Sequence, residues 1–272
     1  MLHKLTAAEL AQYRTDGFVL KHHVFNAQQL RALRVAADRA VATAQQAAAR
    51  PDASTYFLDG NRFVDVGRVT IQFEHQPGSS LVRVMEPVRL LEAEFEQLID
   101  DPRLVQPMQQ IIGADDLALW TDKLNIKAAH EGSGFGWHQD SPYWIHASNN
   151  VDNLPNVMVY FDVADRSNGC LNVIAKSHLA GCLPGSDDQR QLAGFYTHAD
   201  SVDTSRAVAL EAAAGAAIFF NPHLIHGSQP NASSRPRRAI ILTYQSAGRP
   251  ALKTQVERPV RSLSAPSAVH SI

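Results

Sequence analysis

The sequence predicts a mainly β fold, in which two antiparallel sheets pack against each other and helices are added at the N-terminal end and in mid-chain. Two observations predict this class. The second half of the chain consists of short apolar segments separated by turn residues, with few helical patterns between them. The first 113 residues carry the helical patterns, with start and stop signals. Hydrophobic residues make up 45% of the chain, which is ample for the core of such a domain.

The first helix begins and ends at recognisable signals. Thr6 and Glu9 have the spacing of a capping box, in which each side chain accepts a hydrogen bond from the backbone of the other residue. Asp16 and Gly17 end the helix, because glycine adopts the left-handed conformation that closes many helices. A short strand is expected directly afterwards, at 18–20.

A longer helix and a mixed region follow. Asn26 is the expected cap of a helix that runs to about Ala49, with apolar residues on one stripe. From there to Gly67 the pattern is that of a loop, and 69–73 is typical of a strand. Helical periodicity returns over 88–112, where we expect one or two helices that are broken near a proline and closed by a glycine.

The remaining elements are strands. Each is an apolar run bounded by turn residues. The predicted strands cover 117–128, 156–163, 170–174, 213–220 and 238–244. We therefore expect a single domain over 1–272, with a helix-rich part of about 1–113, a β core of about 114–247 and a C-terminal tail of about 248–272 that is mobile after Arg258.

Composition excludes several classes of protein. A formal net charge of −2 without a basic run gives no footprint for nucleic acid or for a membrane surface. Cys170 and Cys182 are too few for a disulfide framework. No apolar run approaches the length of a membrane span, and the N-terminus lacks the apolar core of a signal peptide. The expectation is a soluble, cytoplasmic protein with a small-molecule substrate; its oligomeric state is left open.

A His-x-Asp triplet at His138 and Asp140 is the first candidate for chemistry. On an extended strand, residues two apart point to the same face, so both side chains can bind one metal ion. Two histidines and one carboxylate on one face of the metal form the site of non-haem Fe(II) oxygenases. The triplet occurs twice, however, since His198 and Asp200 repeat it. The position of a third ligand is therefore needed to distinguish between the two triplets.

The third ligand is expected on a later strand. The histidines that follow Asp140 are His146, His178, His198, His223, His226 and His270. Among them, His226 comes just after a strong apolar strand and is followed by a small-residue turn. A lone histidine in such a place is more often a core or rim residue than a ligand. What favours His226 is the group of arginines that follows it.

Three arginines lie downstream of His226, and an enzyme that uses 2-oxoglutarate needs one. The planar fork of arginine binds a carboxylate through two hydrogen bonds, as the distal end of this cosubstrate requires. Arg235 lies in a turn, and Arg237 and Arg238 point to opposite faces of the next strand. The alternation of that strand does not choose between the last two, because both faces are apolar.

Three blocks of residues in the same order resemble the phytanoyl-CoA dioxygenase family of Fe(II)/2-oxoglutarate oxygenases. The first is Trp137 to Asp140. The second runs from Ser167 to Leu171 and leads to Ser177 and His178. The third comprises Phe219 and Phe220, Leu224 to Ser228, Asn231 and Arg237 to Ile240, and the N-terminal Asp16 to Phe18 also agrees. One departure is Ala175-Lys176 where the family turn often has Pro-Gly, which touches no candidate ligand.

The resemblance implies a double-stranded β-helix, or jelly roll, that binds Fe(II), 2-oxoglutarate and O2. It implies metal ligands at His138, Asp140 and His226, and contacts to 2-oxoglutarate from Arg237, Ser228 and Asn125. The last of these is the least distinct, because Thr121 and Lys123 share its strand face. The second triplet, His198 and Asp200, lies too close in sequence to His226 for the intervening strands.

The implied reaction is hydroxylation of an unactivated C–H bond with release of succinate and CO2. The presence of Asp140 argues against halogenation, whereas desaturation and rearrangement stay open. Residues expected near the substrate are Gln72, Phe73, Arg83, Tyr143, Trp144 and His146. Since no basic cluster suited to the phosphates of CoA is evident, a secondary metabolite or an amino-acid-like substrate is favoured over an acyl-CoA. A zinc hydrolase at the same three ligands is the alternative from another class.

Overall fold

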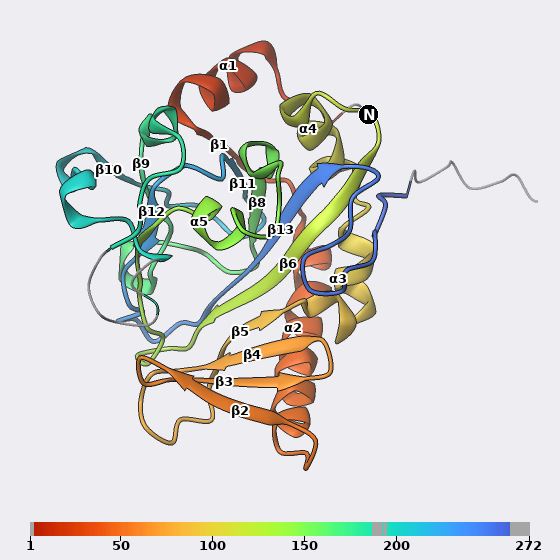
Figure 1. The fold of residues 1–272 in the computed structure, drawn as a ribbon, viewed down its shortest axis with the longest axis vertical. Helices are drawn as coiled ribbons and strands as arrows, with labels where there is room; N and C mark the ends of the chain where they lie inside the picture. Colours follow the sequence, from red (N-terminus) through yellow and green to blue (C-terminus); the bar gives the residue numbers. More distant parts are fainter. Residues whose placement is uncertain (1–2, 187–191, 193–194, 262–272) are drawn as a thin grey trace, which may run out of the picture.

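Two antiparallel sheets form the framework of the protein. The computed structural model describes residues 3–186, 192 and 195–261. The larger sheet has nine strands in the order β1-β11-β8-β13-β6-β5-β4-β3-β2, and the smaller has four in the order β10-β9-β12-β7 (Figure 1). The strands are β1 Phe18–Lys21, β2 Ser54–Leu58, β3 Asn61–Val66, β4 Val69–Phe73, β5 Val82–Glu86, β6 Leu117–Lys127, β7 Phe135–His138, β8 Asn156–Tyr160, β9 Asn172–Ile174, β10 Ala207–Ala209, β11 Ala217–Phe220, β12 His226–Ser228 and β13 Arg237–Ser246. This is the predicted fold class.

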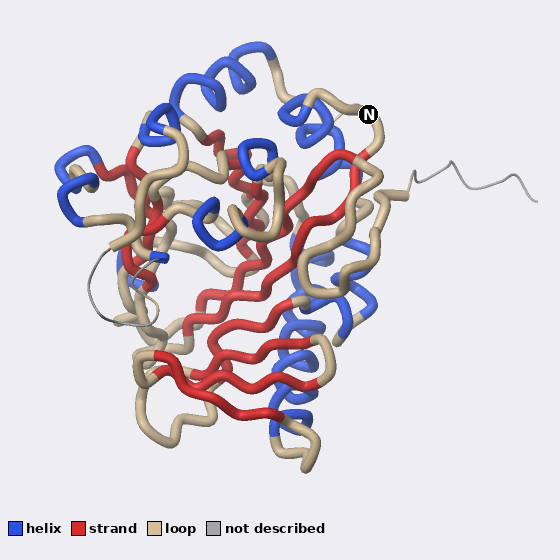
Figure 2. Tube along the Cα trace, in the orientation of Figure 1, coloured by secondary structure: helices blue, strands red, loops and turns tan. Residues whose placement is uncertain are grey.

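Five α-helices accompany the sheets in the described part of the chain. They are α1 Ala7–Asp16, α2 Ala27–Ala48, α3 Ala93–Leu98, α4 Pro102–Ile112 and α5 Ser141–Trp144. The capping box at Thr6 and Glu9 is confirmed, and Asn26 caps α2 through the backbone N–H of Gln29. Helix α2 lies beside the strands β2 to β5 and crosses their direction steeply (Figure 2). None of these helices has the length and apolarity needed to cross a bilayer.

The main core lies between the large sheet and the helices α2 to α4. The stripe of α2 contributes Leu30, Leu33 and a run of small alanines, and the sheet contributes buried side chains such as Ile71 and Met85. A second core fills the space between the two sheets, with Phe220 and Val173 among its members. Because both faces of the central strands are buried, the sheets form a rigid support for side chains at their inner faces.

The loop predicted between Ala49 and Gly67 is a β-hairpin instead. Strands β2 and β3 pair there, joined by Asp59 and Gly60, which both have positive φ. An Asp-Gly pair suits this two-residue hairpin turn. The sequence pattern does not reveal this hairpin, because β2 is partly exposed, with Phe57 61% accessible, and lacks an apolar face. The first 113 residues therefore supply five strands as well as helices.

The segment after residue 247 is docked on the protein as far as residue 261. The guanidinium of Arg258 is buried and pairs with Asp100 at 2.5 Å and Glu96 at 2.9 Å. The backbone N–H of Val260 donates to the carbonyl of Leu117. The expectation of a mobile tail after Arg258 is therefore wrong for 259–261, and the rest of it lies outside the described residues.

Candidate metal centre

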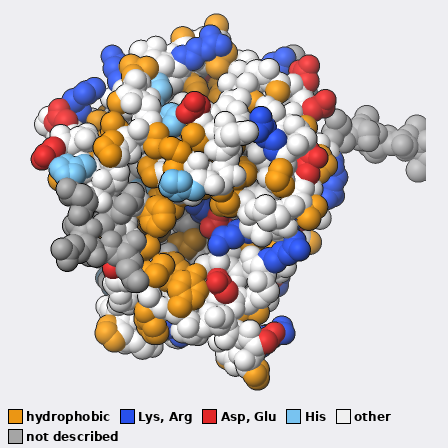
Figure 3. Space-filling view, viewed as in Figure 1, with side chains coloured by type: hydrophobic (Ala, Val, Ile, Leu, Met, Phe, Trp, Pro, Cys, Tyr) orange, Lys and Arg blue, Asp and Glu red, His pale blue; other side chains and the backbone are white. Residues whose placement is uncertain are grey.

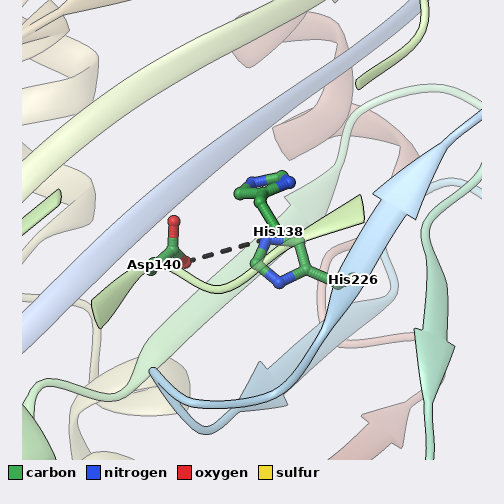
Figure 4. Close-up of side chains that lie close together, drawn as sticks. All are labelled: His138, Asp140 and His226. Atoms are coloured by element: carbon green, nitrogen blue, oxygen red, sulfur yellow. Dashed lines mark ion pairs between the residues drawn. The ribbon is translucent and has the colours of Figure 1, made fainter. Parts of the chain in front are cut away.

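Three potential metal ligands meet at the inner face of the small sheet. His138 is the last residue of β7 and His226 the first of β12, and the two are direct partners in the antiparallel pairing of these strands. Asp140 follows two residues after His138 (Figure 4). The ligand atoms of the three side chains all lie within 4.8 Å of one another, and no other such group of three occurs in the described residues. A single cation can therefore contact all three.

The chain does not continue as a strand between the first two ligands. Strand β7 ends at His138, and Asp140 has helical backbone angles (φ −78°, ψ −29°) at the start of α5. The backbone N–H groups of Asp140 and Ser141 both donate to the carbonyl of Pro222, just before β12. The two side chains are thus brought together by this turn rather than by the alternation of a strand.

Both histidines present the same ring nitrogen to the centre. The Nδ1 of His138 lies 2.7 Å from the carbonyl of Gly136, and the Nδ1 of His226 lies 2.8 Å from that of Leu224. Because a carbonyl can only accept, Nδ1 carries the proton in each ring and the lone pair is at Nε2. Burial, with His226 close by, lowers the pKa of His138 to about 3, so its imidazole is neutral and able to coordinate near neutral pH.

Asp140 is held by a chain of buried hydrogen bonds. The side-chain amide of Asn156 donates to Oδ2 of Asp140 at 2.9 Å, and the hydroxyl of Thr243 donates to the amide oxygen of Asn156 at 2.6 Å. The same Oδ2 lies 3.8 Å from Nε2 of His226. Asn156 comes from β8 and Thr243 from β13, so the large sheet orients a ligand that faces the small sheet.

Arg237 lies beside the three ligands as a buried cation without a counter-ion. Its side chain is 2% exposed, its Nε and Nη1 have no hydrogen-bond partner, and no carboxylate of the described residues lies within 4.0 Å. Burial lowers the pKa of Arg237. Ser228 and Asn125 line the same cavity, and Oδ1 of Asn125 is also unpaired. Buried polar groups are nearly always satisfied, so the unpaired donors of Arg237 suit an anionic ligand.

The other two arginines point away from the cavity, a difference in orientation that strand alternation left open. Arg238 lies on the outer face of β13 and binds Asp162 at 2.9 Å and Asp38 at 2.8 Å. Arg235 is half-exposed in its turn and binds Asp165 at 2.5 Å. Of the three candidates, only Arg237 faces the cavity.

The other candidate histidines that the structure describes make different contacts or lie on the surface. His178 packs against Gly17 and donates from Nε2 to the carbonyl of Arg14. His223 bridges Ser141 and Asp152. His198 lies on the surface with Asp200, its Nδ1 3.6 Å from that carboxylate. His146 is exposed, and His270 lies outside the described residues.

The cavity around the centre has a volume of about 310 Å³ and opens as a hollow in one face of the molecule (Figure 3). Of the residues expected near the substrate, Gln72, Arg83 and Tyr143 line it. The structure places Phe73 in the main core, Trp144 against Trp120 and Leu154, and His146 on the surface, so none of these three forms its wall. Phe73 and Trp144 are buried by packing instead.

Several lining residues were not anticipated. They include Tyr56, Phe63, Thr70, Glu86, Phe195 and Tyr196. Three of them come from the strands β2 to β4, which reach the cavity because the large sheet continues past β6. The Asp-Gly turn at Asp59 and Gly60 was the signal that would have placed this hairpin. Glu86 and Lys123, both charged, face the cavity from β5 and β6.

Comparison with known proteins agrees with this geometry. The family model of phytanoyl-CoA dioxygenase (PhyH) matches residues 13–239. An L-proline trans-4-hydroxylase of Streptomyces griseoviridis is 30% identical over 186 residues, covering 62% of this chain and 69% of the relative. An ectoine dioxygenase of Streptomyces avermitilis is 25% identical over 271 residues, covering 94% and 84%.

Solved structures share the fold. EctD from S. alaskensis, crystallised with 2-oxoglutarate and 5-hydroxyectoine, superposes with a TM-score of 0.68 at 22% identity, covering 89% of this chain and 76% of that one. The α-ketoglutarate-dependent carbocyclase SnoK has a TM-score of 0.66 at 16% identity, covering 90% and 86%. The fold class is thereby confirmed as the jelly roll of these enzymes. The chain belongs to the phytanoyl-CoA dioxygenase family and is an Fe(II)/2-oxoglutarate-dependent dioxygenase.

Proposed function

We propose that His138, Asp140 and His226 hold the iron of this dioxygenase, and that Arg237, Ser228 and Asn125 hold 2-oxoglutarate. The observation that carries the proposal is the buried, unpaired guanidinium of Arg237 beside the three ligands. A zinc hydrolase would have no use for it, whereas the distal carboxylate of 2-oxoglutarate matches its charge and its fork of donors.

The three ligand side chains suit Fe(II) by their chemistry. Two imidazoles and one carboxylate are the donor set of non-haem Fe(II) oxygenases and leave coordination positions open. The Nε2 lone pairs are available because Nδ1 of each histidine is hydrogen-bonded to a carbonyl. When bound, the iron supplies the activation of O2 that oxidises the substrate while 2-oxoglutarate is converted to succinate and CO2.

The protein's own contribution is to orient and to exclude water. Asn156 keeps Asp140 in one orientation, and the paired strands β7 and β12 fix the two imidazoles. Arg237 would hold the distal carboxylate of 2-oxoglutarate through its unpaired donors. The stacked rings of Tyr143 and Phe195, 4.3 Å apart, cover part of the cavity. A dry site strengthens each of these charge interactions.

The substrate we propose is a small, amino-acid-like molecule that is hydroxylated at an unactivated C–H bond. Ligand cavities in proteins span roughly 300–1,000 Å³. The cavity of about 310 Å³ is at the lower end of that range and must hold 2-oxoglutarate as well. The relatives named above include a hydroxylase of L-proline and an ectoine dioxygenase, and L-proline and ectoine are both compact molecules.

The decisive experiment is succinate formation from 2-oxoglutarate by the purified protein with Fe(II) and ascorbate. We expect slow turnover without substrate in the wild type and a loss of at least about 100-fold in His138→Ala and Arg237→Ala, since transition-metal ligands and charge-paired groups carry such effects. The matched controls are His198→Ala and Arg235→Ala, which remove a surface histidine and a surface arginine.

A binding measurement distinguishes a protein that is inactive without its substrate from one whose ligand sites are assigned wrongly. Calorimetric titration of 2-oxoglutarate into anaerobic protein loaded with Mn(II) should show binding to the wild type and to both controls, and weak or no binding to Arg237→Ala. If the metal-loaded wild type does not bind 2-oxoglutarate at millimolar concentration, the proposed roles are wrong.

A further inference from the structure

Two of the charged side chains that line the cavity have opposite signs and lie beside the groups proposed to hold metal and 2-oxoglutarate. They are Lys123 on β6 and Glu86 on β5. These strands are antiparallel, with Val84 opposite Asn125 and Met85 opposite Leu124. The next step of this register brings Glu86 opposite Lys123. Since residues two apart on a strand share a face, both side chains point to the same side as Asn125, into the cavity.

The ammonium of Lys123 lacks a counter-ion. Among the residues that the structure describes, no carboxylate lies within 4.0 Å of its Nζ and no oxygen accepts a hydrogen bond from it. The rings of Trp144 and Tyr143 lie close to it, with centres 5.5 and 5.8 Å from Nζ. The side chain is half-buried. A partly desolvated cation between aromatic rings is suited to receive an anion.

The carboxylate of Glu86 is held in place but only half used. Its Oε1 accepts a hydrogen bond of 2.5 Å from the hydroxyl of Thr121 on β6. Over the described part of the chain, its Oε2 receives no hydrogen bond and no Lys, Arg or His nitrogen lies within 4.0 Å. Thr121 therefore orients Glu86, and the second oxygen is left to bind a donor from the cavity.

These two charges face each other across a strand pair without forming an ion pair. Opposite charges directly opposite each other on neighbouring strands usually attract and pair. Here the gap between them exceeds 4.0 Å, and they border a cavity beside the metal ligands. Tyr143 links the two regions, because its ring packs edge-on against His138 with the centres 6.1 Å apart. The gap has the place and the charges of a ligand site.

We propose that the substrate is a zwitterion whose carboxylate binds Lys123 and whose cationic nitrogen binds Glu86. This rests on the proposed function, because it takes the metal and 2-oxoglutarate to occupy the other end of the cavity. Lys123 lies two residues from Asn125 on the same strand face, a distance of about 6.6 Å along the strand. The carboxylate of 2-oxoglutarate and that of the substrate therefore bind to separate cations, Arg237 and Lys123.

The test compares ligands that differ by one charge. Succinate formation by the Fe(II)-loaded, full-length protein is measured with the twenty common amino acids and ectoine, and the zwitterions that raise turnover above the uncoupled rate are compared with their carboxamides and N-acetyl derivatives. We expect the loss of either charge to reduce kcat/KM by about 10- to 100-fold, as for a hydrogen bond to a charged group.

Variants assign each charge to its side chain. In Lys123→Met, kcat/KM for the zwitterion should fall to the value for its carboxamide. In Glu86→Gln it should fall to the value for the N-acetyl derivative. In each case the change should come mainly from a higher KM. Gln at position 86 keeps an acceptor for Thr121, so the local structure is preserved. Lys4→Met and Glu211→Gln are the matched controls, since both residues are exposed and away from the cavity, and they should keep the wild-type preference.

The outcomes separate this proposal from the proposed function. If the metal-loaded protein binds 2-oxoglutarate but no zwitterion raises turnover, the zwitterion assignment is wrong while the metal and cosubstrate sites stand. If Lys123→Met loses affinity for 2-oxoglutarate by calorimetry and keeps its preference for a zwitterion over the carboxamide, Lys123 belongs to the cosubstrate and the proposal is overturned. If 2-oxoglutarate does not bind at all, both fall together.

Discussion

Asn156 fixes the orientation of Asp140, the proposed carboxylate ligand of the metal. The hydroxyl of Thr243 donates to the amide oxygen of Asn156, which leaves the amide N–H2 facing Oδ2 of Asp140. All three side chains are buried, so water cannot substitute for a lost partner. Side chains that orient metal ligands typically contribute roughly 10- to 100-fold to metal affinity.

We predict that Asn156→Ala weakens binding of Mn(II) or Fe(II) by about 10- to 100-fold, and that Thr243→Val has a smaller effect because the amide is retained but loses its fixed orientation. Calorimetric titration of metal into chelator-treated protein measures both. Asn149→Ala removes an exposed asparagine and serves as the control. Wild-type metal affinity in Asn156→Ala would contradict the orienting role.

For individual residues, the sequence predicts those of the motifs but not the side chains that orient them. His138, Asp140 and His226 were found together as expected, and Arg237 was separated from Arg238 only by the structure. The separation depends on two carboxylates that bind Arg238, from α2 and from the turn after β8, and these lie far away in sequence. Such pairings leave no local pattern, so no periodicity could reveal them.

Strand β6 ends in a lysine that ties two functional loops together. Nζ of Lys127 donates to the carbonyl of Ser133, in the loop before β7, and to that of Gln229, directly after β12. Gly169 packs on the same side chain, where a Cβ would come within 2.8 Å of its Cδ. The strands that carry both histidines are therefore anchored to β6 through one buried amine.

That amine makes stability depend on pH. Burial lowers the pKa of Lys127 to about 6, and the nearby Arg237 and Arg83 act in the same direction. In the unfolded chain a lysine has a pKa of about 10.4, so the unfolded state binds more protons between these values and stability rises with pH across that window. Below about pH 6 the full destabilisation by the charged, buried amine is present.

We predict that the urea midpoint of the wild type rises between about pH 6.5 and 9.5 relative to that of Lys127→Met, which lacks the titrating group. Only the difference between the two pH profiles is used, because other groups titrate in both proteins. Lys4→Met, with an exposed lysine replaced, should follow the wild type. Parallel profiles for the wild type and Lys127→Met would show that the pKa of this lysine is not lowered on folding.

Among whole elements, those with strong local signals were predicted and those defined by distant pairing were not. The caps of α1 and α2 and the long strand β6 follow from local sequence. The hairpin of β2 and β3 has the sequence pattern of a loop because its strands are half exposed. The pairing of β1 with β11 joins segments about 200 residues apart, and only packing in the folded core selects it.

For the molecule as a whole, the proposed ligand sites join the two sheets. Arg237 and Asn125 come from the large sheet, whereas His138, His226 and Ser228 come from the small one. At these proposed sites, metal and 2-oxoglutarate together would bridge the layers, and their binding free energy would add to the stability of the folded protein. Without them Arg237 is a buried charge that lacks a partner, which is unfavourable for folding.

This predicts opposite effects of Arg237→Met with and without ligand. The chelator-treated variant should melt at the same temperature as the wild type or higher, because the unpaired charge is replaced by an apolar side chain. Adding Mn(II) should raise both melting temperatures. Adding 2-oxoglutarate at about 100 times its Kd should then raise only that of the wild type, by about 5 °C, since this ratio contributes about 2.7 kcal/mol. Scanning calorimetry measures each step, with Arg235→Met as the control. A variant that melts well below the wild type without ligand, yet still gains the 2-oxoglutarate increment, would show that Arg237 supports the fold rather than the cosubstrate.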